Sequence, residues 1–411
     1  MTTTLSYGRE TICLLDSEEV VQLRPQSQQP LSNDEIAAAV RAQLDEPHNY
    51  PPLSRATIPG DCIVLAIEPG IPQQLSVIDG ALTALRNAGA EEALITILLS
   101  GALADAQLLK NELAALGHAE CHIKVHDPDD AKGNSFLGVN QAGQALRINR
   151  RLCDADFVLP IAVATLEVQR RGQPASLEGL LTAFSAREAI ERFSADAVDL
   201  DAKACADHLN EIDECGRLLG IGMTLQVVPS PGGNVSAVLA GEPTNVASQA
   251  AANYRQTWCC DTESRGGLVV ATIAGDADQQ TWQNVGRAVA AAEAVLETGG
   301  AIAIYSELAE PPGRSLCQLV GNEDPRVVER EILRHPSADS GPALQLCRAL
   351  QRGAIYLHSQ LRPAVVESLG MTPLDSDSEL QHLAKTLRPC LVLAEAQRLL
   401  PTVVEAEAGS A

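Results

Sequence analysis

Lysine, aromatic residues and long apolar runs are all scarce in this sequence of 411 residues. Aromatic residues make up 3% of it. Lysine occurs only five times, at Lys110, Lys124, Lys132, Lys203 and Lys385. No apolar run reaches the length of about 18 residues that a membrane-spanning helix needs, so no membrane partner is expected. The N-terminal stretch has no basic start, and Arg9 and Glu10 interrupt it, so we expect no signal peptide and a cytoplasmic protein.

Basic residues are fewer than acidic residues. The chain has 30 Lys and Arg against 53 Asp and Glu, a net charge of −23. Such a surface repels phosphate backbones, which argues against nucleic acid as a partner. Solubility is a sufficient reason for the acidic surface. The preference for arginine over lysine, with abundant alanine, is typical of a GC-rich bacterial genome.

The 11 cysteines follow no Cys-x-x-Cys spacing. In a reducing cytosol they are expected to be free thiols, several of them packed as small hydrophobic side chains. Cys259 and Cys260 form the only adjacent pair, and His122 and His126 lie four residues apart at a predicted strand end. A metal ion at either place would need further ligands, so the sequence predicts no metal site.

Strands and helices alternate from residue 61 onward. Apolar runs of strand length at 61–67, 93–99 and 121–125 enclose stretches with helical periodicity at 75–88 and 105–116. This order predicts an α/β fold with mainly parallel sheets and helices on both faces. Two hairpins are predicted, at 137–150 and 223–239.

A second α/β unit begins after Arg265-Gly-Gly267, where a strand at 268–273 precedes an alanine-rich helix from about 281 to 297. We therefore predict an N-terminal domain over residues 1–264 and a C-terminal α/β domain over 265–397. Residues 398–411 are predicted to form a C-terminal tail.

The first candidate binding segment follows the buried strand predicted at 157–164. Ligands of α/β proteins sit in the turns after such strands. Here the turn carries Glu167, Arg170 and Arg171, and arginine fits a carboxylate or phosphate through two parallel hydrogen bonds. The alternative is a solvated turn with a local ion pair.

The second candidate segment is the head of the helix near residue 281, with Asp278, Gln279 and Gln283. Backbone N–H groups at a helix start favour an anion. Asp278 is alternatively the cap of that helix, and both roles are compatible. Trp282 is expected to pack in the core.

Three motifs, in order, resemble those of the nickel-dependent lactate racemases. The first combines Val125-His-Asp-Pro-Asp129, Phe136-Leu-Gly138 and the run from Arg147-Ile-Asn149 to a buried strand. The second is Val238-Leu-Ala-Gly-Glu-Pro243 at a predicted hairpin end. The third is Asp278-Gln-Gln-Thr-Trp-Gln283, whose helix ends at Glu297-Thr-Gly-Gly300. The resemblance covers about residues 50 to 400.

This resemblance implies two α/β domains with a cleft between them. In the family the cleft holds a nickel pincer nucleotide bound covalently to a lysine. A histidine binds the nickel, and two further histidines act as acid and base on the two sides of the lactate α-carbon.

The residues that hold this cofactor are not kept here. Ser100-Gly-Ala-Leu103 and Glu167 stand where the family has its two acid–base histidines. Leu177 stands near the lysine and Phe193 near the nickel ligand. A further family lysine matches Gly286, with Arg287 beside it as a candidate substrate-binding residue. There is no lysine between Lys132 and Lys203 and no histidine between His126 and His208, so no cofactor is expected.

Two hypotheses of function follow. One is a racemase or epimerase of a 2-hydroxy acid, as the family resemblance implies. The other is a non-catalytic protein that binds a small anion or a partner protein in the same cleft. In either case, we expect the site where Glu167, Arg170 and Arg171 face the segment 278–283. The sequence indicates neither the ligand nor the oligomeric state.

Overall fold

The computed structural model describes residues 2–8, 10–16, 20–101, 103–140, 143–166, 177–196, 202–322 and 324–404. The candidate turn with Glu167, Arg170 and Arg171 lies outside these residues. No helix within the described ranges has the length and apolar character needed to cross a membrane.

The first of two six-stranded sheets contains the strands predicted in the N-terminal part of the chain. Its order is β11-β10-β9-β4-β5-β6, and all neighbours are parallel except β10 and β11. The strands are β4 (Ile63–Ile67), β5 (Ile95–Leu99), β6 (His122–Val125), β9 (Phe157–Val163), β10 (Thr224–Ser230) and β11 (Asn234–Gly241).

Both faces of this sheet are covered, which explains the unbroken apolar runs of its strands. Ile63 and Leu65 point to one face, where they join a core with helices α1, α3 and α4. Val64 and Ala66 point to the other, toward α5 to α8 and the hairpin of β7 and β8. These elements are α1 (Asn33–Asp45), α3 (Gln74–Asn87), α4 (Leu103–Ala115), α5 (Arg150–Asp154), α6 (Glu178–Phe184), α7 (Arg187–Asp196), α8 (Ala202–Leu218), β7 (Asn134–Val139) and β8 (Ala145–Asn149).

The second sheet is wholly parallel, in the order β16-β15-β14-β13-β17-β3. Its strands are β13 (Gly266–Thr272), β14 (Leu296–Tyr305), β15 (Ala354–His358), β16 (Thr372–Pro373), β17 (Cys390–Leu393) and β3 (Val20–Leu23). One face packs on α9, α10, α11, α12 and α13, and the other on α14 and on the hairpin of β1 and β2. The bounds of these elements are α9 (Pro243–Trp258), α10 (Trp282–Ala294), α11 (Pro325–Arg334), α12 (Ser340–Arg352), α13 (Pro363–Ser368), α14 (Asp377–Thr386), β1 (Thr2–Tyr7) and β2 (Glu10–Asp16).

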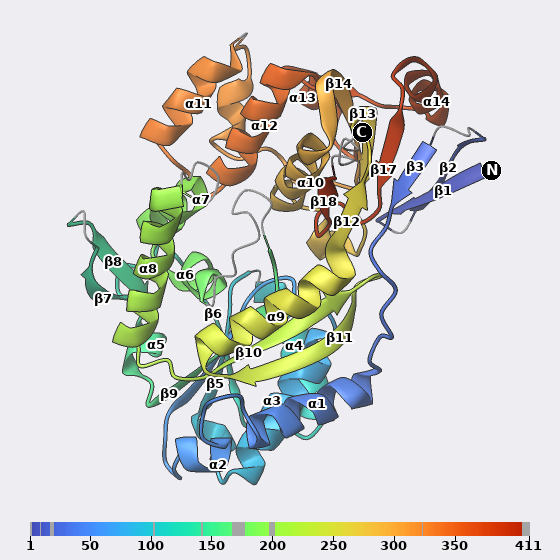
Figure 1. The fold of residues 1–411 in the computed structure, drawn as a ribbon. Coiled ribbons are helices and arrows are strands. Elements are labelled where there is room, and N and C mark those ends of the chain that lie inside the picture. Colours follow the sequence, from blue (N-terminus) through green and yellow to red (C-terminus); the bar gives the residue numbers. More distant parts are fainter. Residues whose placement is uncertain are drawn as a thin grey trace, which may run out of the picture.

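The chain crosses between the two units more than once. Strand β3, close to the N-terminus, forms an edge of the second sheet. Leu400–Val403, within the stretch predicted as a tail, forms β18 and pairs with β12 (Cys259–Thr262). Helix α9 lies along β10 and β11 and reaches the second unit at its C-terminal end (Figure 1).

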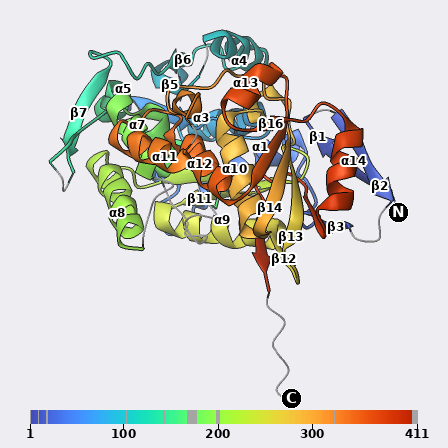
Figure 2. The same ribbon diagram turned by 90° about the horizontal axis from the view of Figure 1, so that it is seen from above.

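The predicted α/β class with mainly parallel sheets is confirmed. Figure 2 shows the second sheet, seen from above, with α10 and α12 on one side and α14 on the other. Most helix ends agree with the periodic runs because turn-forming residues mark them. Ser32, for example, caps α1 in a reciprocal capping box with Glu35. However, α10 ends at Ala294, before the predicted end at 297, and β14 begins at Leu296.

Candidate functional site

A cleft of about 1100 Å³ lies between the carboxyl ends of the two sheets. The loops that line it follow β4, β5, β6 and β9 of the first sheet and β13, β14 and β17 of the second. Ligands of open α/β sheets bind where neighbouring strands connect in opposite directions. Both sheets have such a point, and both points open into this cleft.

In the first sheet the direction changes between β4 and β9. Glu68 and Gly70 follow β4 and Thr165 follows β9, and all three line the cleft. Ser100 and Gly101 line it from the end of β5.

In the second sheet the direction changes between β13 and β17. Asp278 and Gln279 come from the loop after β13, and Gln397 and Arg398 from the turn after β17. The two loops meet where the Arg398 guanidinium donates a hydrogen bond from Nη2 to Gln279 Oε1 at 3.3 Å. A parallel sheet places the ends of adjacent strands side by side, which brings these distant residues together.

Two aromatic residues of α9, Tyr254 and Trp258, contact Arg398 and fix its position. Tyr254 Oη donates a 2.6 Å hydrogen bond to the Arg398 carbonyl oxygen, and the guanidinium lies 5.9 Å from the Trp258 ring centroid. Burial lowers the pKa of Arg398, and nearby Arg287 lowers it further, while Glu395 and Asp278 act in the opposite direction. Two guanidinium groups therefore share one wall of the cleft.

The helix that carries Arg287 also shapes this wall. Thr281 is the N-cap of α10, and its side chain accepts a hydrogen bond from Asn284 N at 3.3 Å. The alternative role of Asp278 as the cap of this helix is excluded, because Asp278 belongs to a separate 3-10 turn, Ala277–Gln279. Arg287 donates from Nη1 to Asn284 Oδ1 at 3.2 Å.

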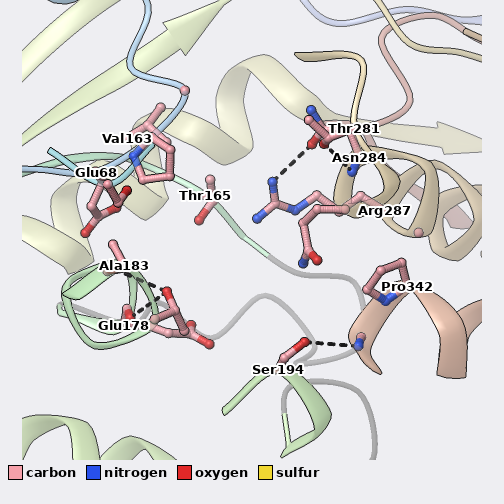
Figure 3. A pocket seen from close by; sticks show the side chains of 18 of the residues that line it. Glu68, Val163, Thr165, Glu178, Ala183, Ser194, Thr281, Asn284, Arg287 and Pro342 are labelled. Atoms are coloured by element: carbon pink, nitrogen blue, oxygen red, sulfur yellow. Dashed lines mark hydrogen bonds between the residues drawn. The ribbon is translucent and has the colours of Figure 1, made fainter. Parts of the chain in front are cut away.

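The opposite wall carries two carboxyl groups, Glu68 and Glu178 (Figure 3). Glu68 is 9% exposed, and its carboxyl group lies against Gly179 so closely that a Cβ there would overlap it. Burial, together with the charge of Glu178, raises the pKa of Glu68 to about 8. The Glu68 carboxyl group is therefore protonated and uncharged near neutral pH, whereas the guanidinium groups opposite are positively charged.

His126 is the only histidine among the described lining residues, and both of its ring nitrogens are engaged. Nε2 donates to the Ser185 carbonyl oxygen at 2.8 Å, so Nδ1 is the acceptor of a 3.0 Å hydrogen bond from Asn149 Nδ2. Burial lowers the pKa of His126, which favours the neutral ring. His122 is exposed, and the described residues contain no group of three or more metal-binding side chains.

Four of the predicted site residues line the cleft: Asp278, Gln279, Gln283 and Arg287. Glu167, Arg170 and Arg171 lie outside the described residues, so the predicted meeting of the two segments stays a prediction. Trp282 is 3% exposed, as expected for core packing, and donates from Nε1 to the Glu310 carbonyl oxygen at 3.0 Å.

Sequence reasoning missed Glu68, Glu178 and Arg398. Glu68 and Arg398 each lie in the loop after an apolar strand. Such a loop is expected to contact a ligand when its strand stands at the point where the strand order changes direction.

Three comparisons bear on this architecture. Residues 7–167 match the family model of the lactate racemase N-terminal domain. The fold is similar to that of the lactate racemase apoprotein from Thermoanaerobacterium thermosaccharolyticum, with a TM-score of 0.79 and 16% identity over 98% of this chain and 100% of that one. It is also similar to a protein from Thermotoga maritima, with a TM-score of 0.69 and 12% identity over 92% and 100%. No curated protein matches the chain.

Proposed function

We propose that this chain, which carries a lactate racemase N-terminal domain in a lactate racemase fold, binds a small organic carboxylate in its cleft without a nickel nucleotide. The observation that carries this proposal is the placement of Arg287 and Arg398 on one wall. Two guanidinium groups in a partly desolvated cleft match the geometry and charge of a carboxylate.

The surroundings of Arg398 support an anion as the missing partner. Among the described residues, its guanidinium makes one hydrogen bond, to the neutral amide of Gln279. Asp278 and Glu395 are close enough to influence its charge, but no ion pair to either is formed among the described residues. A buried cation is stabilised when a charged partner hydrogen bonds to it, which a bound carboxylate would do.

The residues of this cleft do not fit the nickel nucleotide that the family resemblance implies. No lysine lines the cleft among the described residues, and residues 167–176 contain none by sequence. The position compared with the nickel-binding histidine is Phe193, a fully buried side chain. Both ring nitrogens of His126 are already engaged. These observations favour a protein in which the lysine anchor and the histidine ligand are both lost.

Isothermal titration calorimetry with D-lactate, L-lactate and L-malate tests the proposal. We expect at least one of them to bind and its affinity to fall by about tenfold or more in Arg287→Gln and in Arg398→Gln. The matched control is Arg326→Gln, which removes an exposed arginine on α11, outside the cleft. If none of the three acids binds, or if both cleft variants bind as the wild type does, the proposal is wrong.

A 2-hydroxy-acid isomerase is the second candidate. The observation that favours it is Glu68, a cleft carboxyl group whose pKa of about 8 suits proton transfer near neutral pH. Incubation of pure L-lactate with the protein, followed by chiral chromatography, tests this candidate. D-lactate would appear with the wild type and not with Glu68→Gln.

A further inference from the structure

Glu68, Glu178 and His208 lie along one side of the cleft, where Glu68 and His208 are buried and Glu178 is partly exposed. Glu68 and Glu178 line the cleft, whereas His208 lines a second cavity of about 1160 Å³. This second cavity lies between α7, α8 and the loop after α11. The three side chains therefore connect two solvent-accessible spaces through the protein interior.

The Glu68 carboxyl group packs directly against Gly179. No larger residue at position 179 leaves room for the Glu68 carboxyl group in its observed place, because a Cβ would overlap its Cδ and both oxygens. The carboxyl group makes no hydrogen bond or ion pair among the described residues, and Glu178 is its charged neighbour. Burial and the negative charge of Glu178 both favour a proton on the Glu68 carboxyl group over a second negative charge.

His208 supplies a second, independent observation. It is 5% exposed, and neither ring nitrogen has a hydrogen-bond partner among the described residues. Its Nε2 lies 3.5 Å from Glu178 Oε1, slightly beyond ordinary hydrogen-bond length. The ring packs edge-on against Phe193, with centroids 5.4 Å apart. A buried imidazole without partners is costly, and it can both accept and donate a proton next to Glu178.

We propose that Glu68, Glu178 and His208 form a proton path between the second cavity and the cleft, and that anion binding at Arg287 and Arg398 takes up one proton through it. This proposal rests on the proposed function for the anion, while the path itself rests on the three side chains alone. A bound anion adds negative charge to the cleft, and the pair of glutamates responds by holding its proton more tightly.

The proton balance is simple. A proton from solvent enters at the His208 imidazole, passes to a Glu178 oxygen and then to a Glu68 oxygen, and no bond to carbon is made or broken. The charged and titratable groups around Glu68 are Glu178 on α6, His208 behind it on α8, His126 after β6, and the two arginines across the cleft. Burial contributes most to the raised pKa of Glu68, and of these charged groups Glu178 is the one that raises it further.

Infrared difference spectroscopy of the protein without ligand tests the path directly. Between about pH 6.5 and about pH 9.5 we expect the loss of a protonated carboxyl band that is absent in Glu68→Gln. After a rapid pH jump, His208→Phe should slow the loss of this band by about tenfold and leave its midpoint pH unchanged, which a merely structural role would not do. A spectrum without this band, or an unchanged rate in His208→Phe, would overturn the path.

Calorimetry at about pH 8 in HEPES and in Tris then tests the coupling, because the two buffers release protons with different enthalpies. At this pH Glu68 already holds about half a proton, so for L-lactate we expect uptake of up to about half a proton by the wild type and none by Glu68→Gln. Binding without proton uptake overturns the coupling and leaves the proposed function intact. Absence of binding counts against the proposed function and the coupling together, and the infrared result still decides the path.

Discussion

Arg398 and Gln279 lie 119 residues apart in the chain, yet Arg398 Nη2 donates to Gln279 Oε1 at 3.3 Å in the cleft. They meet because β13 and β17 are adjacent in the second sheet and each residue follows one of these strands. The cleft is thus assembled by strand order, and its positive wall depends on both loops.

Replacing Gln279 with Glu should give Arg398 an internal carboxylate at hydrogen-bond distance. We expect carboxylate affinity to fall by about tenfold or more, because the site then carries its own anion. The free energy of unfolding should be unchanged or higher, because a buried cation gains a charged partner. Calorimetry and urea denaturation measure the two effects. Gln283→Glu adds the same charge on the neighbouring helix turn and is the control, and an equal loss of affinity there would argue against this geometry.

Glu68 should make stability depend on pH in a defined window. Its pKa is raised from 4.5 to about 8, so between these values the folded state holds a proton that the unfolded state has lost. The free energy of unfolding therefore decreases as pH rises, by about 1.4 kcal/mol per pH unit for one proton, and levels off above about 8. Glu68→Gln lacks this term and should be the more stable protein above about pH 8. Urea denaturation across this range measures the difference.

Glu293 provides the comparison for that experiment. Burial raises its pKa to about 7, and its carboxylate accepts a hydrogen bond from Gln345. Glu293→Gln should therefore change the pH dependence only below about pH 7. A slope between pH 7 and pH 8 that survives in Glu68→Gln would show that another group is responsible.

Gly179→Ala should displace the Glu68 carboxyl group, because the new Cβ would overlap it. The carboxyl group ends a flexible side chain, so we expect it to turn toward the cleft while the backbone stays in place. The pKa of Glu68 would fall toward its ordinary value, and the stability slope between pH 7 and pH 8 would disappear. A slope identical to that of the wild type would contradict the contact.

Gly286 of α10 packs against Pro342 of α12. A Cβ there would lie 2.9 Å from Pro342 Cα, an atom that cannot move alone. Gly286→Ala should lower the free energy of unfolding by roughly 1–3 kcal/mol through overpacking. Gly286→Lys, which introduces the residue type that the family has there, should destabilise the protein more. Thermal unfolding checks both, and a Lys variant as stable as the wild type would show that the two helices separate easily.

Much of the fold follows from local pattern. The strands and helices of both units were predictable because buried parallel strands read as short apolar runs, and Gly or a capping residue marks the helix ends. The loop at Asp278 and Gln279 was identified for the same reason, because it follows such a strand. The sequence alone leaves the cap of the following helix open, because Asp278 and Thr281 are both good caps, and the observed backbone identifies Thr281.

The remaining features of the fold and of the cleft depend on pairing between segments that are distant in the sequence. Nothing local indicates that β3 joins the second sheet. The sequence predicts a tail from residue 398 because β18, which follows Arg398, is a strand of only four residues. The raised pKa of Glu68 depends on its burial in the assembled fold and on Glu178, which comes from a different element 110 positions later. These contacts between distant segments can be recognised only when the strand order of both sheets is known.

The absence of a lysine-anchored nickel nucleotide is the central claim about this cleft. The direct test is the intact mass and nickel content of the protein after co-expression with the enzymes that make the cofactor. We predict the unmodified mass and no stoichiometric nickel. A nickel-containing adduct on any lysine would contradict the account.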